Sequence, residues 1–451
     1  MPYLIVRGGT IVTMNPKGDI VPDGSVVIEG DKIVDVGTRI DIDRKYSANE
    51  IIDTKDMVIL PGLVNAHIHT VQSLFRGIAD DVSLLDYLDN FVLPLEESMN
   101  KDDVYISSLL GYAEMIKSGI TTCADLQSVH YVDEAMKAAQ KTGIRARIAK
   151  TLMDSGDFPA GLIESLEEST KDSVRILQLW HGKENGRIQF AFAPRFVHSC
   201  SLELMREVRR LANKYKVSIY THAAENKTEA KEVKRKYKKT TIELLQEVGL
   251  TGNDVLLAHC IWLSEKEFKI LKETNSNVVH CPSCNMKLAS GICNVNRMVK
   301  DGITVALGTD AAPCNNTSDI FREARLAALL GKVSYLNPKI LPANVVLKMA
   351  TLHGARALGL DNDIGSIEKG KKADLVLINF KKLHLTPVYN VVSHLVYCCQ
   401  GSDIDTVIID GKIVMKNRRL KFVEEEDLMS EAHQQAEHLF DRADLQGKQR
   451  R

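Results

Sequence analysis

Residues 63–70 read LVNAHIHT, an apolar run that ends in the pattern His-x-His. Alternate residues of a strand point to the same face, so the imidazoles of His67 and His69 can face one ion. Two histidines in this pattern are weak evidence alone. The other strands of the 451-residue chain must therefore show whether they bring similar side chains to the same place.

Seven further apolar runs follow, and most precede segments of helical character such as LELMREVRRLANKY at 202–215. Strands are predicted at 63–70, 121–126, 145–154, 188–196, 217–225, 254–260, 277–281 and 303–310. Eight strands that alternate with helices over about 250 residues are what a (β/α)8 barrel requires. The number of strands alone also fits an open, doubly wound sheet.

The polar residues at the strand ends favour the barrel. The first run ends with His67 and His69, the fifth with His222, the sixth with His259 and the eighth with Asp310. The carboxyl ends of barrel strands converge on one face, so residues distant in sequence become neighbours there. The sequence therefore predicts an α/β protein with a TIM-like (β/α)8 barrel and a metal site at that face.

Imidazoles with one carboxylate suit Zn²⁺ or a similar divalent ion such as Fe²⁺, and such an ion lowers the pKa of a bound water toward neutrality. Glu225 lies three residues past His222, where it can protonate a ring nitrogen of a substrate. We expect Asp310 to take the proton of the water and His259 to hold that water by a hydrogen bond. One ion is expected, because the fourth strand offers Arg195 where a two-metal site needs a lysine, and arginine cannot be carbamylated.

The other histidines are interpreted as core or surface residues. His280 ends a strand, and Cys281 and Cys284 form a C-x-x-C beside it, but no second cysteine pair follows at the spacing of a zinc site. We interpret this pair as core packing and loop. The remaining histidines set aside in this way are His130, His181, His198, His353, His384, His394, His433 and His438.

Both ends of the chain carry short alternating runs with glycine-containing turns, which are typical of β-hairpins. These runs lie at 4–14, 25–37, 51–60, 372–380 and 405–415. Because sheets of few strands are poorly stable alone, we expect the two ends to form one small β-sandwich domain. The predicted boundaries are 1–60 plus 364–421 for this domain, 61–363 for the barrel and 422–451 for a C-terminal helix and tail.

The composition argues against several classes of protein. The formal net charge is -1, which gives no basic excess for nucleic acid. No apolar run reaches the ~18 residues of a membrane span, and the first residues lack the features of a signal peptide. Nine cysteines without regular spacing fit a reducing compartment. We expect a cytoplasmic protein with no membrane or nucleic-acid partner.

The motifs together resemble the amidohydrolase superfamily, in its branch of methylthioadenosine/S-adenosylhomocysteine deaminases, guanine deaminase and s-triazine hydrolases. The resemblance runs from PGLVNAHIHT through LFRGIADD, VLPLEE, THAAE, LLAHC, VVHCPSCNMKLASG and VALGTDAAPCNN to GSIEKGKKADLV. It implies the barrel, the split β domain and a homo-oligomer.

The resemblance also implies roles for single residues. The metal ligands of the family fall on His67, His69, His222 and Asp310. The glutamate that shuttles protons falls on Glu225, and the histidine that assists the water falls on His259.

Substrate contacts point in two directions. In adenosine-type members a glutamate binds the ribose hydroxyls, and VLPLEE offers Glu96 for that role. Pro194-Arg195-Phe196 instead resembles guanine deaminase, whose arginine contacts the base and whose phenylalanine stacks on it. Some members hold a homocysteine carboxylate with an arginine where this chain has Lys150.

The leading hypothesis is therefore a deaminase of a small amino-heterocycle, specifically an adenosine-type nucleoside such as 5'-deoxyadenosine or methylthioadenosine. The alternatives are a deaminase of guanine or of another amino-heterocycle such as a pterin, an s-triazine hydrolase, and an inactive barrel that acts as a binding protein. Glu225 favours deamination over displacement of chloride, because it can protonate the ring. The complete set of site residues argues against an inactive barrel.

Overall fold

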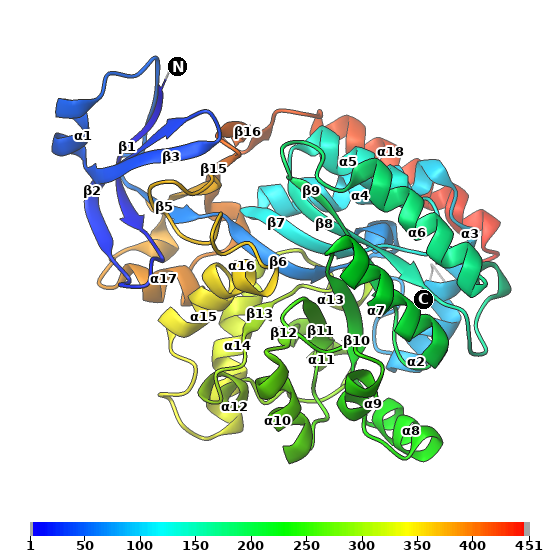
Figure 1. Ribbon diagram of the computed structural model, residues 1–451. Helices are drawn as coiled ribbons and strands as arrows, with labels where there is room; N and C mark the ends of the chain where they lie inside the picture. Colours follow the sequence, from blue (N-terminus) through cyan, green and yellow to red (C-terminus); the bar gives the residue numbers. More distant parts are fainter. Residues whose placement is uncertain (1–2, 446–451) are drawn as a thin grey trace. The chain divides into compact units, whose positions relative to one another are not determined.

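The computed structural model describes residues 3–445, and the chain divides into two compact units (Figure 1). Of the described residues, the first unit contains 66–112, 123–318 and 425–445. The second contains residues 3–65, 113–122 and 319–424. Among the described residues, no helix is long and apolar enough to cross a membrane.

Eight strands follow one another around a single sheet, in the order of the chain. They are β6 (Leu63–Ile68), β7 (Ile120–Leu126), β8 (Arg145–Leu152), β9 (Ile188–Pro194), β10 (Ile219–Ala223), β11 (Val255–His259), β12 (Asn277–His280) and β13 (Val305–Leu307). The pairs from β8 to β13 are parallel. The backbone N–H of Asp310 donates to the carbonyl of His67 at 2.9 Å, so the chain after β13 returns to β6. The predicted (β/α)8 barrel is confirmed.

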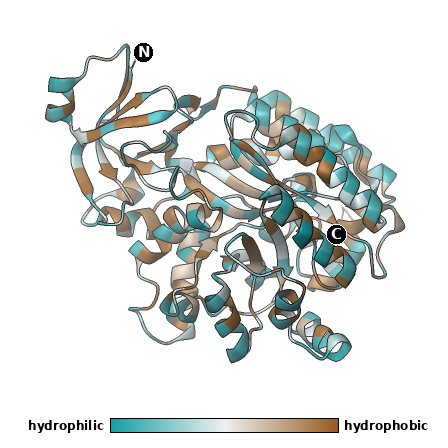
Figure 2. Cartoon of the chain, viewed as in Figure 1, coloured by the Kyte–Doolittle hydropathy of each residue, from teal (hydrophilic) through white to brown (hydrophobic). Residues whose placement is uncertain are grey.

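Helices follow most of these strands, and each packs an apolar face inward. In the helix predicted at 202–215, Leu204, Val208 and Leu211 are buried at helical spacing, and the Ser201 side chain caps the first turn. Figure 2 shows hydrophilic residues along the outer faces of such helices. The helices of the barrel unit are η1 (Thr70–Phe75), α2 (Leu84–Tyr87), η2 (Leu88–Val92), α3 (Leu93–Ser98), α5 (Val132–Thr142), η3 (Ala160–Leu162), α6 (Leu166–Trp180), α7 (Leu202–Tyr215), α8 (Lys227–Tyr237), α9 (Thr241–Glu247), α10 (Glu265–Thr274), α11 (Pro282–Lys287), α12 (Val295–Lys300), α13 (Ala312–Asn315) and α18 (Glu425–Arg442); α4 runs over Lys101–Lys117.

Several strands end earlier than the sequence predicts. β6 stops one residue before His69, and β13 stops three residues before Asp310, so neither residue closes a strand. Left-handed backbone conformations explain part of this difference, because φ is 60° at Asp310, 72° at His259 and 50° at Ala224. A residue in this conformation cannot continue a strand. The chain therefore turns sharply at the carboxyl ends of these strands.

The second unit contains a nine-stranded mixed sheet built from both ends of the described chain. β14 pairs antiparallel with β5, and β5 pairs parallel with β1, which joins the late strands to the early ones. The strands are β1 (Tyr3–Val12), β2 (Ile20–Glu29), β3 (Lys32–Thr38), β4 (Glu50–Asp53), β5 (Met57–Pro61), β14 (Leu375–Asn379), β15 (Ile404–Ile409), β16 (Lys412–Lys416) and β17 (Arg419–Leu420). The helices are α1 (Arg39–Lys45), α14 (Ile320–Ser334), α15 (Ala343–Met349), α16 (Leu352–Ala357), η4 (Leu383–Leu385), α17 (Val391–Tyr397) and η5 (Gly401–Asp403).

The small β domain predicted from both chain ends is confirmed. Its sheet buries apolar residues on both faces, with Val6 and Val26 in one cluster and Ile5 and Val27 in another. The exact boundaries given above for the three segments stay a prediction. Of the predicted tail, residues 446–451 lie outside the described part of the chain.

Gly308 permits the close approach of β13 to β6. A Cβ at this position would lie 2.8 Å from the His67 Cβ and 2.8 Å from Val279 Cγ1. Gly308→Ala is therefore expected to lower the free energy of unfolding by about 1–3 kcal/mol, a typical cost of overpacking, as measured by urea unfolding. Gly37→Ala is the control, because its Cβ would meet Ile42 no closer than 3.7 Å. Equal losses in the two variants would contradict the role given to Gly308.

Candidate active site

His69 and His222 face each other through their ring nitrogens. Their Nε2 atoms lie 3.2 Å apart. Each ring donates its Nδ1–H to a backbone carbonyl at 2.8 Å, His69 to Leu126 and His222 to Arg195. Because Nδ1 carries the proton, each Nε2 presents only a lone pair, and two lone pairs at this distance repel each other. Two nitrogens bound at about 2.05 Å to a tetrahedral zinc ion would lie about 3.3 Å apart, so the spacing fits a shared cation.

The other predicted ligands complete the cluster. Oδ1 of Asp310 lies 3.5 Å from Nε2 of His67 and 3.5 Å from Nε2 of His69. One ring nitrogen from each of His67, His69 and His222 lies within 4.8 Å of the other two. One ligand atom from each of His67, His259 and Asp310 also lies within 4.8 Å of the other two. The four predicted ligands therefore surround one small volume.

The charge states of these residues suit a metal ion. Burial lowers the pKa of His69 to about 3 and the pKa of His222 well below its usual value, so both rings are neutral at neutral pH. Burial alone would raise the pKa of Asp310, but the nearby imidazoles, His67 first, hold that pKa well below its usual range. Neutral imidazoles with one carboxylate are ligands that Zn²⁺ and Fe²⁺ accept.

A second pair of groups lies beside this cluster. His259 Nε2 is 3.6 Å from Glu225 Oε2 and 3.8 Å from Asp310 Oδ2, and its Nδ1 lies 2.9 Å from Oδ1 of Asn285. Burial raises the pKa of Glu225. Burial lowers the pKa of His259, but the charges of Glu225 and Asp310 outweigh it and leave that pKa raised. A carboxyl and an imidazole with raised pKa values can hold and transfer protons near neutral pH.

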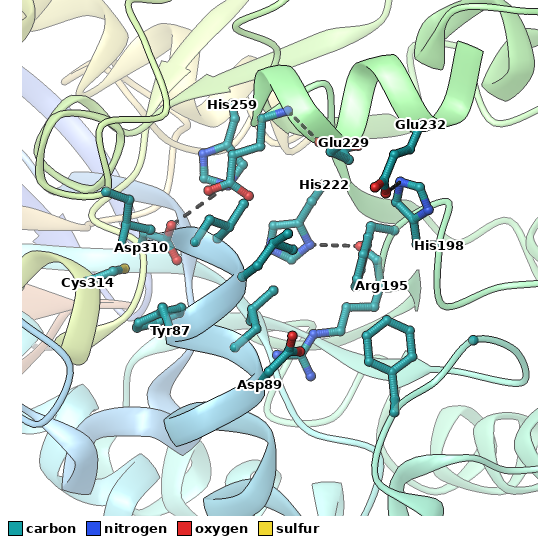
Figure 3. A pocket seen from close by; sticks show the side chains of 18 of the residues that line it. Tyr87, Asp89, Arg195, His198, His222, Glu229, Glu232, His259, Asp310 and Cys314 are labelled. Carbon is teal, nitrogen blue, oxygen red and sulfur yellow. Dashed lines mark hydrogen bonds and ion pairs between the residues drawn. The ribbon is translucent and has the colours of Figure 1, made fainter. Parts of the chain in front are cut away.

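These groups open into a pocket of about 340 Å³ (Figure 3). His222, His259 and Asp310 line it together with Glu225. A pocket of this size with convergent polar groups is typical of a small-molecule site.

A buried ion pair stands at one wall of the pocket. Arg195 donates from Nη1 to Glu96 Oε2 at 2.8 Å and from Nη2 to Oε1 at 3.3 Å. Gln72 and Ser128 donate to the same carboxylate at 2.7 and 3.2 Å, and the Tyr87 hydroxyl donates to the Gln72 amide oxygen at 3.0 Å. These contacts fix the direction of the Gln72 amide.

The predicted substrate contacts differ in their access to the pocket. Arg195 and Phe196 line it, and Phe196 packs edge-to-face on Phe158 with ring centroids 5.7 Å apart. Glu96 is 4% exposed and meets Arg195, but it is not among the described residues that line the pocket. The arginine and the phenylalanine are thus accessible to a ligand, and the glutamate supports the arginine.

Other candidates from the sequence lie in the core. Lys150 is completely buried, and its Nζ donates to the Val129 carbonyl and to Glu164, each at 2.7 Å. Burial lowers the pKa of His280 to about 3. Cys281 and Cys284 are both buried, as the core interpretation of this pair predicts, and His280 is buried beside them.

Sequence reasoning missed several residues of the site. Gln72 and Tyr87 line the pocket, and Asn285 holds His259. His198, interpreted as a core or surface residue, also lines the pocket. Cys284, interpreted as packing, is buried and lies within 4.8 Å of ligand atoms of the acid–base pair. Asn285 and Cys284 stand in the motif VVHCPSCNMKLASG, which was the one available signal for them.

Residues 58–414 match the profile of the amidohydrolase family. The chain belongs to the amidohydrolase family. The expected resemblance is therefore confirmed, and the amidohydrolase match includes all the predicted site residues.

Individual amidohydrolases resemble the chain over almost its whole length. It is 40% identical over 443 residues to a 5'-deoxyadenosine deaminase of Methanosarcina acetivorans, covering 98% of this chain and 100% of the relative. It is 39% identical to a 5-methylthioadenosine/S-adenosylhomocysteine deaminase of Syntrophus aciditrophicus, covering 96% and 97%. An adenosine deaminase of Xanthomonas campestris, solved with bound zinc, superposes with a TM-score of 0.93 at 30% identity, covering 97% and 98%.

Glu96→Ala leaves the Arg195 guanidinium buried without its carboxylate. We expect a loss of about 3–5 kcal/mol in the free energy of unfolding, because an uncompensated buried charge is costly. The double variant Glu96→Ala/Arg195→Ala should lose less than the sum of the two single variants, as measured by a double-mutant cycle in urea. Lys269→Ala, which breaks an exposed pair with Glu273 at 3.7 Å, should change stability little. Additive losses in the cycle would show that the pair is not coupled.

Proposed function

We propose that this chain is a mononuclear metal-dependent aminohydrolase that deaminates the base of an adenosine-type nucleoside, such as 5'-deoxyadenosine or methylthioadenosine. The observation that carries the proposal is the Glu225–His259 pair beside a metal-type donor set in one pocket. The 40% identity to a 5'-deoxyadenosine deaminase over nearly the whole chain supports the substrate class.

His67, His69, His222 and Asp310 would hold one divalent ion, Zn²⁺ in our proposal, with Fe²⁺ as the alternative. When bound, the ion would lower the pKa of a water molecule and make it a nucleophile near neutral pH. The 3.2 Å spacing between Nε2 of His69 and His222 supports this assignment. The zinc in the related adenosine deaminase structure supports the choice of metal.

The chain's own side chains would move the protons. Asp310, whose pKa is held low, accepts a proton from the attacking water and passes it to the departing amino group. Glu225 protonates a ring nitrogen, which makes the adjacent carbon easier to attack, and it recovers a proton from the added hydroxyl group as ammonia leaves. His259 lies between the two carboxyls and stabilises negative charge there. Water and the amino-purine thus become an oxo-purine and ammonia.

We propose that Arg195 and Phe196 contact the base, because both line the pocket. Glu96 is proposed to bind the ribose hydroxyls. Each Glu96 oxygen already accepts two hydrogen bonds, so this contact requires one of them to open. Movement of Gln72 or Arg195 when substrate binds would supply that opening.

We also propose a cytoplasmic homo-oligomer. All nine cysteines are free thiols, which supports a reducing compartment. Leu336, Leu383 and Tyr389 are each at least 90% exposed, and the proposed oligomer is expected to bury some of these side chains.

A deaminase of guanine or of another amino-heterocycle, such as a pterin, is the second candidate. Arg195 and Phe196 favour it, because the Pro-Arg-Phe segment reaches the pocket. An s-triazine hydrolase and an inactive binding barrel remain as outcomes of the substrate test below.

Removal of a proposed ligand should remove the metal. His222→Ala is expected to reduce bound zinc from about one ion per chain to almost none, measured by elemental analysis after dialysis. Chelation should lower the melting temperature of the unsubstituted protein, because the ion binds only the folded chain. His130→Ala is the control, since His130 is half-exposed and lies outside the donor cluster. Full zinc occupancy in His222→Ala would exclude that ligand set.

Ammonia release by the zinc-loaded enzyme tests the substrate. The panel contains 5'-deoxyadenosine, methylthioadenosine, S-adenosylhomocysteine, adenosine, guanine, a pterin and melamine. We expect turnover of the adenosines, and a fall in kcat of about 10²–10⁴-fold in Glu225→Gln, the usual range for a general acid. Turnover of guanine or the pterin alone would favour the second candidate. Silence across the panel with metal bound would overturn the deaminase proposal.

A further inference from the structure

Four α-helices of the barrel unit begin with the same capping box, in which a glutamate accepts hydrogen bonds from the backbone at the helix start. The glutamates are Glu168 in α6, Glu229 in α8, Glu243 in α9 and Glu267 in α10. Such a position favours the ionised carboxylate. Hydrogen bonds with Ser165 lower the pKa of Glu168, and those with Lys266 and Thr240 lower the pKa of Glu243 to about 2.

Glu229 departs from this pattern. Burial, and after it the charge of Glu225, raises its pKa to about 7. Its Oε2 accepts from the backbone N–H of Glu225 at 2.9 Å and of Asn226 at 3.3 Å. Its Oε1 is buried and has no hydrogen-bond partner among the described residues. A buried anionic oxygen without a donor is costly, whereas a protonated oxygen is much less so.

The position of Glu229 connects it to the chemistry. It lines the same pocket as Glu225, at the start of α8 above His222 (Figure 3). The titratable groups around it from other elements are Glu225, His259 and His198, whose ring bonds to the Glu229 backbone. On α8 itself, Glu232 and Lys236 line the pocket too. Both carboxyls are buried, and the charge of Glu225 disfavours ionisation of Glu229.

We propose that Glu229 is a positioning residue for Glu225: it anchors the Glu225 backbone at the pocket and carries a proton that leaves the two carboxyls with at most one negative charge. The proposal rests on the proposed role of Glu225 in proton transfer. The anchor fixes where the Glu225 carboxyl lies. The proton on Glu229 leaves Glu225 as the group that exchanges protons with the substrate.

Two substitutions separate the anchor from the proton. Glu229→Gln keeps an amide oxygen that can accept the two backbone N–H groups, but it cannot ionise. Glu229→Ala removes both functions. Glu168→Gln is the matched control, because Glu168 fills the same capping position in α6 and forms hydrogen bonds with Ser165.

The proton is tested without substrate, on the zinc-loaded protein. The folded pKa of Glu229 is about 7 against an ordinary value of 4.5, so the stability it contributes is present below about 4.5 and is lost as pH rises toward 7. Glu229→Gln should therefore gain stability relative to the unsubstituted protein over that window, whereas Glu168→Gln should not. Infrared titration should show a protonated carboxyl that disappears near pH 7 and is missing in Glu229→Gln. A constant stability difference, or an infrared band unchanged in Glu229→Gln, would overturn the assigned proton.

The anchor is tested by kinetics on whichever panel substrate is turned over. Glu229→Ala should lower kcat by about 10–10²-fold with a small change in KM, because misplacing a catalytic group by about 1 Å costs that much. Glu229→Gln should restore most of kcat but lose the step near pH 7 in the pH profile of kcat/KM. Unchanged kcat in Glu229→Ala would overturn the anchor. If no substrate is turned over, the proposed function fails, and the substrate-free measurements still decide the state of Glu229.

Discussion

The hydrogen bond between the Asp310 N–H and the His67 carbonyl is the contact on which the site depends. It brings the segment after the last barrel strand back to the first strand, and both residues contribute side chains to the donor cluster. The same backbone contact therefore completes the fold and sets the distance between a carboxylate and an imidazole. Gly308 lies beside it because a side chain there would meet His67.

Backbone carbonyls accept the Nδ1–H of the imidazoles and so orient the rings. The Nε2 lone pairs are therefore left free to bind a cation. Leu126 and Arg195 supply the carbonyls that hold His69 and His222 in one tautomer. Arg195 thus serves the site twice, through its carbonyl toward His222 and through its guanidinium toward Glu96. The donor cluster and the pocket wall that contains Arg195 are consequently linked through a single residue of the chain.

The barrel and the gathering of the donor side chains could be predicted because strand periodicity places His67, His222 and His259 at strand ends, and barrel topology then brings those ends together. The split β sheet followed from short alternating runs at both ends of the chain. The walls of the pocket could not be derived in this way. Arg195 and Glu96 are 99 positions apart, and their contact depends on the helical segment η2–α3, whose path no periodicity specifies. The place of Gln72 in the pocket could not be predicted either, because it lies in the short helix η1, whose path no periodicity specifies.

The left-handed backbone at Ala224, His259 and Asp310 lowers the stability of the fold, whereas the side chains of His259 and Asp310 are needed in the site. Each side-chain-bearing residue in this conformation costs of the order of 1–3 kcal/mol. Glycine would relieve that cost at His259 or Asp310, but it would also delete the imidazole or the carboxylate. Substitutions that raise the free energy of unfolding must therefore lie elsewhere in the chain. The carboxyl face of the barrel tolerates such substitutions least.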